Sequence, residues 1–175
     1  MQGRVDIFTD GSASTKDGSG GWAFVATKRP GHKVEGFSSQ QYHADDIVMR
    51  KASGGKGSTT SNAMELDAMY QALTWLRGKV YHGHDDPTVS LYTDSKYARS
   101  AVTQWAWNWR KNGWVNSTGQ PVANRQRIEY TLLRLLQLRN EHGVSVKIKW
   151  VKGHAGYYYN EMADQMAGEA RRKTL

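Results

Sequence analysis

The chain has 175 residues, enough for one domain with a substantial core but short for two, so we expect a single domain over residues 1–175. It contains no cysteine, which excludes disulfides and thiolate metal sites and leaves a hard ion such as Mg²⁺ or Mn²⁺ as the metal that it could bind. The net charge of +8 favours a polyanionic partner, whereas the lack of a signal peptide or of a bilayer-length apolar run excludes a membrane protein and predicts a cytoplasmic one.

The first part of the chain predicts β-strands. Val5 to Asp10 and Trp22 to Thr27 are typical of strands, and the Gly- and Ser-rich stretch between them, Gly11 to Gly21, indicates the turn of a hairpin. Ile47 to Gly54 predicts a third strand. Residues 29–46 are polar and weakly periodic, which predicts an extended hairpin end or a loop.

The second part predicts alternating helices and strands. Apolar residues recur at helical spacing from Asn62 to about Leu76. The remaining predicted elements are a turn at Gly83–Pro87, a strand at Val89–Asp94, a helix from Ser95 to about Trp109, a helix from Ile128 to Gly143, a half-buried strand at Val144–Trp150 and a helix from about Asn160 to Arg171. Three strands followed by alternating helix and strand indicate the α/β class, with helices packed on a mixed sheet.

Two aspartates end predicted strands in nearly the same sequence, FTDGS and YTDSK. If the two strands are parallel neighbours, Asp10 and Asp94 emerge together at the C-terminal edge of the sheet, where α/β proteins place ligands. They could then share a divalent ion. The alternative is local: Asp10 would begin a turn, and Asp94 would cap the following helix.

Two further carboxylates belong to predicted helices. Glu65 falls on the inward side of its helix, although Asn62 and Glu65 could instead form a capping box. Asp164 follows the predicted cap Asn160, where a negative charge is favourable in any helix.

Taken together, the four carboxylates suit phosphodiester hydrolysis. Four such groups can hold two divalent ions roughly 4 Å apart, one activating water and the other stabilising the leaving 3′ oxygen. His154, in the glycine-flanked sequence KGHAG, could approach such a site, although a histidine in a loop is more often simply solvated.

A second group of residues indicates nucleic-acid binding. Between positions 95 and 128 there is no Asp or Glu, and tryptophans alternate with basic residues. This composition suits a surface that packs on sugars or bases and neutralises phosphates. The predicted contacts in this stretch are Trp109, Arg110, Lys111 and Trp114. Core packing is the alternative, and it fits Trp105 best.

Five blocks of the sequence resemble those of bacterial-type, or type 1, ribonuclease H, in the same order: IFTDGS, TTSNAMEL, YTDSKY, TQWAWNWRKNGW and WVKGHAGYYYNEMAD. The resemblance covers nearly the whole chain outside residues 29–46. It implies a ribonuclease H-like fold, a five-stranded mixed sheet of three antiparallel and then parallel strands with flanking helices. It also implies a monomeric endonuclease, without a hybrid-binding domain before Asp10, that cuts the RNA strand of RNA/DNA hybrids and leaves 5′-phosphates.

The resemblance also implies a role for each site residue. The ligands of two Mg²⁺ ions, which Mn²⁺ can replace, would be Asp10, Glu65, Asp94 and Asp164. His154 would assist water activation or product release. The segment from Trp105 to Trp114 resembles the basic protrusion that holds the DNA strand. Thr60 and Asn124 would hold a DNA phosphate, and Asn62 would read the minor groove.

Several positions depart from the family pattern. Lys16 and Ser61 stand where asparagine is common, Lys96 follows Ser95 where glutamine is common, and Ala63 replaces an arginine beside the phosphate pocket. Lys16, Ser61, Ser95, Lys96 and, as the first residue of the protrusion, Trp105 complete the predicted nucleic-acid contacts. Because lysine only donates hydrogen bonds, we expect recognition to depend more on charge.

Two other functions fit parts of the pattern. A related two-metal nuclease of the same fold, such as a junction resolvase, would share the carboxylates, but the basic protrusion and the GHAG loop argue against it. A hybrid-binding module without catalysis would not require all four carboxylates and His154.

Overall fold

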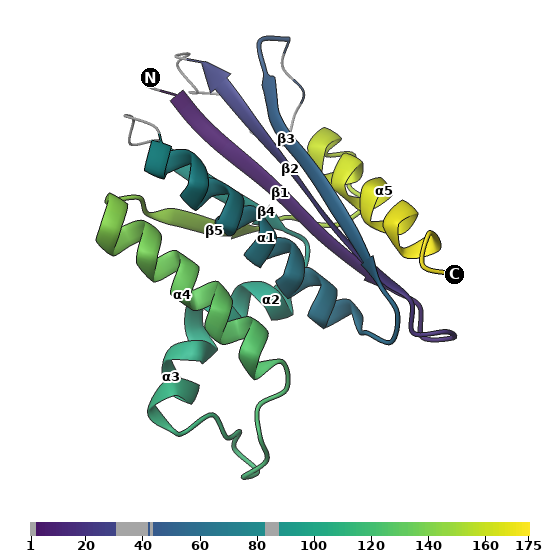
Figure 1. Ribbon diagram of the computed structural model, residues 1–175, viewed down its shortest axis with the longest axis vertical. Helices are drawn as coiled ribbons and strands as arrows, with labels where there is room; N and C mark the ends of the chain where they lie inside the picture. Colours follow the sequence, from purple (N-terminus) through teal and green to yellow (C-terminus); the bar gives the residue numbers. More distant parts are fainter. Residues whose placement is uncertain (1–2, 31–41, 43, 83–87) are drawn as a thin grey trace.

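The computed structural model describes residues 3–30, 42, 44–82 and 88–175, and its centre is a five-stranded mixed sheet (Figure 1). The strands are β1 (Gly3–Ala13), β2 (Gly20–Pro30), β3 (Ile47–Lys56), β4 (Thr88–Thr93) and β5 (Val146–Trp150). They lie in the order β3-β2-β1-β4-β5; β1, β2 and β3 are antiparallel, and β4 and β5 run parallel to β1. The predicted mixed sheet is confirmed. The predicted turn at 83–87 and most of segment 29–46 lie outside the described residues.

Helices cover both faces of the sheet. α1 (Ser61–His82) packs on one face with α4 (Arg125–His142) beside it, and α5 (Tyr158–Arg172) packs on the other face against β1, β2 and β3 (Figure 1). Between β4 and α4 the chain forms α2 (Lys96–Ser100), the π-helical turn η1 (Ala101–Trp105) and α3 (Ala106–Lys111) without a break. None of the helices in the described part of the chain combines the length and the apolar character needed to cross a membrane.

Side-chain alternation along β1 explains why both faces are covered. Val5 and Ile7 belong to the core under α1, whereas Phe8 belongs to the core under α5. The Phe8 ring lies 5.1 Å from that of Tyr92, centroid to centroid, and 5.4 Å from that of Tyr159 on α5. Burying a side chain of this size stabilises a fold by about 1.5–3 kcal/mol, so these rings fix α5 to the sheet.

Two helix or strand ends and the exposure of one side chain show how the structure differs from the prediction. β1 continues beyond Asp10, because its pairing with β2 extends to Ala13 opposite Gly20. α5 begins before Asn160, and that residue is buried within the helix, so the prediction that it caps the helix is wrong. The alternation along β5 predicts a buried Trp150, yet this residue is 40% exposed at the end of the strand.

A buried ion pair joins the first residue of segment 29–46, Arg29, to the last, Asp46. Arg29 donates to Asp46 through two nitrogens, Nε to Oδ1 at 2.6 Å and Nη2 to Oδ2 at 2.9 Å, and the side chains are 3% and 1% exposed. Tyr159 of α5 donates its hydroxyl to Asp46 at 3.0 Å. Burial and this hydrogen bond raise the pKa of Tyr159. The three residues therefore join the ends of the segment to α5.

We predict that Asp46→Asn destabilises the protein by about 3–5 kcal/mol, because it removes the carboxylate to which the buried Arg29 guanidinium donates two hydrogen bonds. Tyr159→Phe should cost only about 1 kcal/mol, the contribution of one hydrogen bond. Urea unfolding measures both. Glu129→Gln, which removes the exposed Arg125–Glu129 pair, is the matched control and should cost less than about 0.5 kcal/mol. Equal costs for Asp46→Asn and Glu129→Gln would contradict the assignment.

Candidate active site

Asp10 and Asp94 leave neighbouring parallel strands at the same level. Phe8 of β1 lies opposite Tyr92 of β4, and each aspartate follows two residues later. Neither has the local role that was the alternative. Asp10 lies within β1, opposite Ala23 of β2, and does not begin a turn. The cap of α2 is Ser95, whose Oγ accepts from the backbone of Ala98 at 3.0 Å, and not Asp94.

Glu65 reaches the same place from α1. The helix packs directly on β1 at Gly11, where a Cβ atom would overlap the backbone of Met64 and Glu65, so only glycine allows this approach. The capping-box alternative for Glu65 is wrong. Thr60 caps the helix, because its Oγ1 accepts from the backbone of Ala63 at 3.2 Å.

Asp10, Glu65 and Asp94 form a tight carboxylate cluster. One oxygen from each residue lies within 4.8 Å of the others; Asp10 and Glu65 are buried and Asp94 is partly buried. Burial raises the pKa of Glu65 to about 8, with repulsion from Asp94 adding to it, and burial followed by repulsion from Glu65 and Asp94 raises that of Asp10. The pKa of Asp94 is also raised, chiefly by burial.

The cluster has the properties of a divalent-cation site. Glu65 Oε2 is buried and has no hydrogen-bond partner among the described residues, which is costly for a carboxylate oxygen unless a cation lies beside it. The donors are all carboxylate oxygens, the ligands that Mg²⁺ and Mn²⁺ prefer. The residues present therefore fit a hard divalent ion.

Asp164 and His154 lie next to this cluster, on its open side. Asp164 of α5 lies close enough to Asp10 to raise the pKa of Asp10 further, and its side chain is 40% exposed. His154 Nδ1 lies 4.0 Å from Asp164 Oδ2, and the imidazole is 81% exposed. The loop that carries His154 can approach Asp94 closely because position 153 is glycine. A Cβ atom at this position would lie 2.8 Å from Asp94 Oδ2. The glycine is visible in the sequence KGHAG, but from the sequence alone it indicates only a mobile loop and not a close approach to Asp94.

The aromatic residues of the protrusion form a connected row. Ring centroids are 6.0 Å apart for Tyr97 and Trp105, 5.7 Å for Trp105 and Trp109, and 6.4 Å for Trp109 and Trp114. The expectation that Trp105 belongs to the core is wrong, since it is 38% exposed, whereas Trp114 is 7% exposed. Trp114 thus serves mainly to hold the protrusion together. Arg110 and Lys111 are exposed, as a phosphate contact requires.

The other predicted nucleic-acid contacts are spread over the surface around the cluster. Thr60 is exposed, as are Ser61 and Asn62 at the start of α1 and Lys16 in the turn between β1 and β2. Asn124 adopts a left-handed backbone conformation, φ 61°, and its Nδ2 donates to the Tyr97 hydroxyl at 3.2 Å.

Lys96 is placed by a residue that the sequence did not single out. Its Nζ lies 4.8 Å from the centroid of the Trp150 ring, and the Trp150 indole donates to the backbone oxygen of Asp94 at 3.0 Å. Trp150 therefore connects the Lys96 ammonium to the backbone at Asp94.

Comparison with known proteins agrees with the resemblance seen in the sequence. A family model described as RNase H matches residues 2–172. Proteins named Ribonuclease H from Saccharopolyspora erythraea and Rhizobium etli are 37% and 38% identical to this chain; they cover 97% and 93% of it, over 92% and 88% of their own lengths.

Solved structures share the fold at lower identity. A crystal structure of a type 1 RNase H with the type 2 active-site motif has a TM-score of 0.73 at 23% identity, covering 100% of this chain and 75% of that one. A foamy viral protease-reverse transcriptase in complex with RNA/DNA hybrid has a TM-score of 0.72 at 19% identity, covering 98% of this chain and 20% of that one. The predicted fold class is confirmed.

The raised pKa values predict a stability that depends on pH and on metal. Glu65 binds a proton more tightly in the folded state, so its contribution is fully present below its usual pKa of 4.5 and is lost as the pH rises through about 8. We therefore expect Mg²⁺ to raise the Tm most at pH 8 and least at pH 5, because the ion then replaces the missing protons.

Asp10→Asn tests this directly. It should stabilise the metal-free protein at pH 8 by about 1–3 kcal/mol, since it removes a carboxyl that burial and the neighbouring acids prevent from ionising as it would in water, and it should reduce the effect of Mg²⁺. Glu169→Gln, a charge removal on α5 away from the cluster, is the control and should change neither quantity. A wild-type Tm at pH 8 that does not respond to Mg²⁺ would contradict the metal site.

Proposed function

The chain belongs to the ribonuclease H family, and on that premise we propose that it hydrolyses the RNA strand of RNA/DNA hybrids by two-metal-ion catalysis. The observation that carries the proposal is the cluster of Asp10, Glu65 and Asp94, whose oxygens lie within 4.8 Å of one another. Asp164 would be the fourth ligand, and because its side chain is 40% exposed, the site is open to a substrate and to water on that side.

The cluster supports hydrolysis at the phosphate of a scissile linkage. Two divalent ions held by these carboxylates would activate the attacking water and neutralise the charge on the leaving oxygen. Water oxygen bonds to phosphorus, the bond from phosphorus to the 3′ oxygen breaks, and the products carry a 3′-hydroxyl and a 5′-phosphate. Asp164 and His154, 4.0 Å apart, are placed to receive a proton from the water or to release the product.

The charged surface supports a hybrid as the substrate. One structural neighbour is described in complex with RNA/DNA hybrid. In this chain, the acid-free stretch between positions 95 and 128 carries the exposed Arg110 and Lys111, which would neutralise phosphates of the DNA strand. Lys96, whose ammonium lies over the Trp150 ring, would contact a phosphate near the cleavage site, and the exposed Asn62 would read the minor groove.

We predict that the protein cuts only the RNA strand of a uniform RNA/DNA hybrid, and only when Mg²⁺ or Mn²⁺ is present. Asp94→Asn should lower turnover by about 10³-fold or more, because a metal ligand supports several kcal/mol of transition-state stabilisation, and should leave the fold intact. The assay uses hybrids labelled on either strand, with EDTA, duplex DNA and a four-way junction as controls. Preferential cutting of the junction would favour the resolvase alternative, and hybrid binding without cleavage would favour the inactive module.

His154→Ala should slow turnover by about 10²- to 10⁴-fold without abolishing it, because water can partly replace a positioned acid or base. Imidazole added to the assay should restore part of the rate in this variant and none in Asp94→Asn. Single-turnover kinetics over a range of pH measures the effect on the chemical step. An unchanged rate across that range would show that His154 is only a solvated loop residue.

A further inference from the structure

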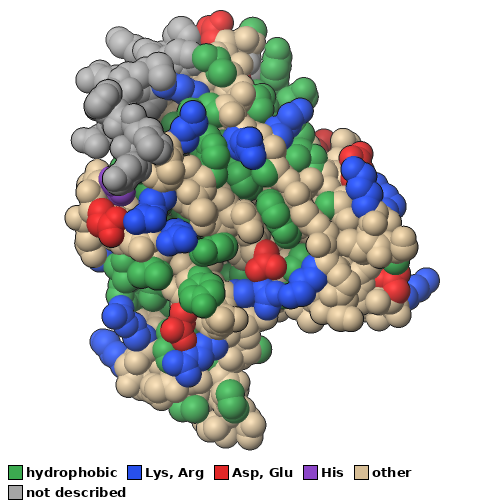
Figure 2. Space-filling model, in the orientation of Figure 1, with side chains coloured by type: hydrophobic (Ala, Val, Ile, Leu, Met, Phe, Trp, Pro, Cys, Tyr) green, Lys and Arg blue, Asp and Glu red, His purple; other side chains and the backbone are tan. Residues whose placement is uncertain are grey.

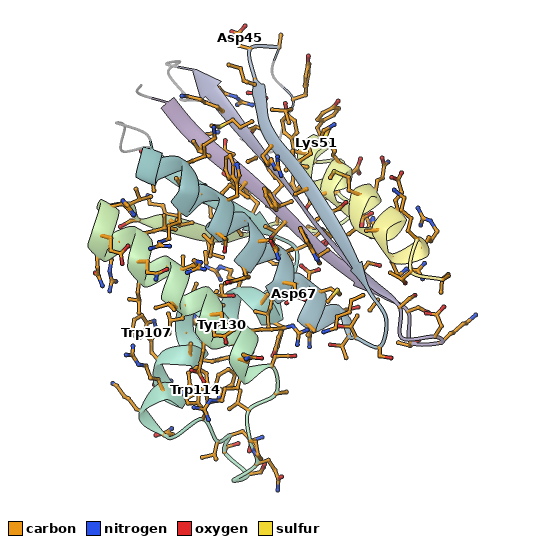
Figure 3. The ribbon with its side chains drawn as sticks, in the orientation of Figure 1. Asp45, Lys51, Asp67, Trp107, Trp114 and Tyr130 are labelled. Atoms are coloured by element: carbon orange, nitrogen blue, oxygen red, sulfur yellow. The ribbon has the colours of Figure 1, made fainter. Side chains whose placement is uncertain are left out.

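A polar cleft lies on the outer surface where α1 and α4 meet, away from the carboxylate cluster. Its volume is about 330 Å³, and its lining residues are Lys56, Asp67, Tyr70, Gln71, Gln126, Arg127 and Tyr130. We refer to it as the α1–α4 cleft. Figure 3 marks Asp67 on α1 and Tyr130 on α4, at its two sides. Figure 2 shows Lys and Arg side chains gathered around an acidic side chain at this place.

The lining groups suit an anion. Arg127 donates its Nε to Asp67 Oδ1 at 2.8 Å, and its two terminal nitrogens make no hydrogen bond to any residue that the structure describes. The edge of the guanidinium that best fits a phosphate is therefore available. Lys56, exposed at the end of β3, adds a second cation. Among the described residues, Asp67 is the one carboxylate that lines the cleft, and Arg127 already engages it.

The walls of the cleft are held rigidly. Arg134 donates to the Tyr70 hydroxyl at 3.2 Å and to Thr74 Oγ1 at 3.1 Å, and its guanidinium lies 5.3 Å from the centre of the Tyr70 ring. Gln126 donates to the Tyr130 hydroxyl at 3.1 Å. A preformed cleft loses little conformational freedom when it binds a ligand.

The position of the cleft points to one ligand. Lys56 lies four residues before Thr60, and Arg127 lies three residues after Asn124, about one helical turn. Thr60 and Asn124 are the residues that the resemblance to ribonuclease H implies hold a DNA phosphate. Successive phosphates on a strand rise by about 3.4 Å along the helix axis, so a strand held there continues toward a nearby cation.

We propose that the α1–α4 cleft binds a second backbone phosphate of the DNA strand, with Arg127 as the main contact and Lys56 as the second. The inference rests on the proposed function and extends the DNA-strand surface beyond Thr60, Asn124 and the protrusion. Asp67 then has a defined role, because it orients the Arg127 side chain and lowers the net positive charge of the cleft.

The test compares Arg127→Gln with Asp67→Asn. If the ion pair were purely structural, the two variants would affect hybrid binding equally. Hybrid binding is measured by fluorescence anisotropy at several salt concentrations, in the Asp94→Asn background to prevent cleavage. Arg127→Gln should weaken binding by about tenfold and reduce the slope of log K against log salt by about 0.7–0.9, and Lys56→Gln should reduce the slope similarly. Asp67→Asn keeps both cations and removes the carboxylate, so it should tighten binding, by about two- to fivefold.

Equal weakening by Arg127→Gln and Asp67→Asn would show that the pair only joins α1 to α4, and the inference would be overturned. Unchanged binding in Arg127→Gln would overturn it as well. The Tm of each variant is measured in parallel, since both variants break the same ion pair and should lose similar stability while their effects on binding have opposite signs.

A second measurement places the contact on the DNA strand. Neutral methylphosphonate linkages are introduced one at a time into the DNA strand, and binding to the parent and to Arg127→Gln is compared. One linkage should weaken binding of the parent and have no further effect on the variant. If no linkage shows this coupling while the wild-type protein still cleaves hybrid, only the inference fails. If the wild-type protein neither binds nor cleaves hybrid, the proposed function fails with it.

Discussion

The parallel pairing of β1 with β4 is the constraint on which the site depends. It brings together two strands that are about 80 residues apart in the chain and sets Phe8 opposite Tyr92. From this register, Asp10 and Asp94 reach the edge of the sheet side by side. A shift of one residue in either strand would turn its aspartate to the other face of the sheet and put a core residue in its place. The apolar packing of β1 therefore also fixes the relative positions of Asp10 and Asp94.

The carboxylate cluster lowers the folding stability of the protein. Asp10 and Glu65 are held out of water and near one another by the contact of α1 with Gly11, and the raised pKa values reflect that cost. The apolar cores on the two faces of the sheet offset it. The arrangement is therefore costly without a cation; a bound ion would reduce this cost and so couple ion binding to folding stability.

Most of the fold and the acidic residues could be predicted from the sequence, because strand periodicity, helix periodicity and the repeated phrase around Asp10 and Asp94 are local signals. The helix caps could not, since Thr60 and Asn62, or Asp94 and Ser95, are equally plausible caps in sequence and only the backbone decides between them. The burial of Trp114 and the exposure of Trp105 depend on how the protrusion folds back. The pairing of Asp67 with Arg127 joins residues 60 positions apart, and no local pattern indicates it.

The buried contact of Arg29, Asp46 and Tyr159 also separates two parts of the chain that can change independently. Because the two ends of the connection between β2 and β3 are fixed to α5, the entropy of closing that connection grows only slowly with its length, by about 0.6 kcal/mol for each doubling. Lengthening or replacing the intervening residues would leave the register of β1, β2 and β4 undisturbed. In evolutionary terms, the connection between β2 and β3 is a position at which the chain can acquire new sequence without moving Asp10, Glu65 or Asp94.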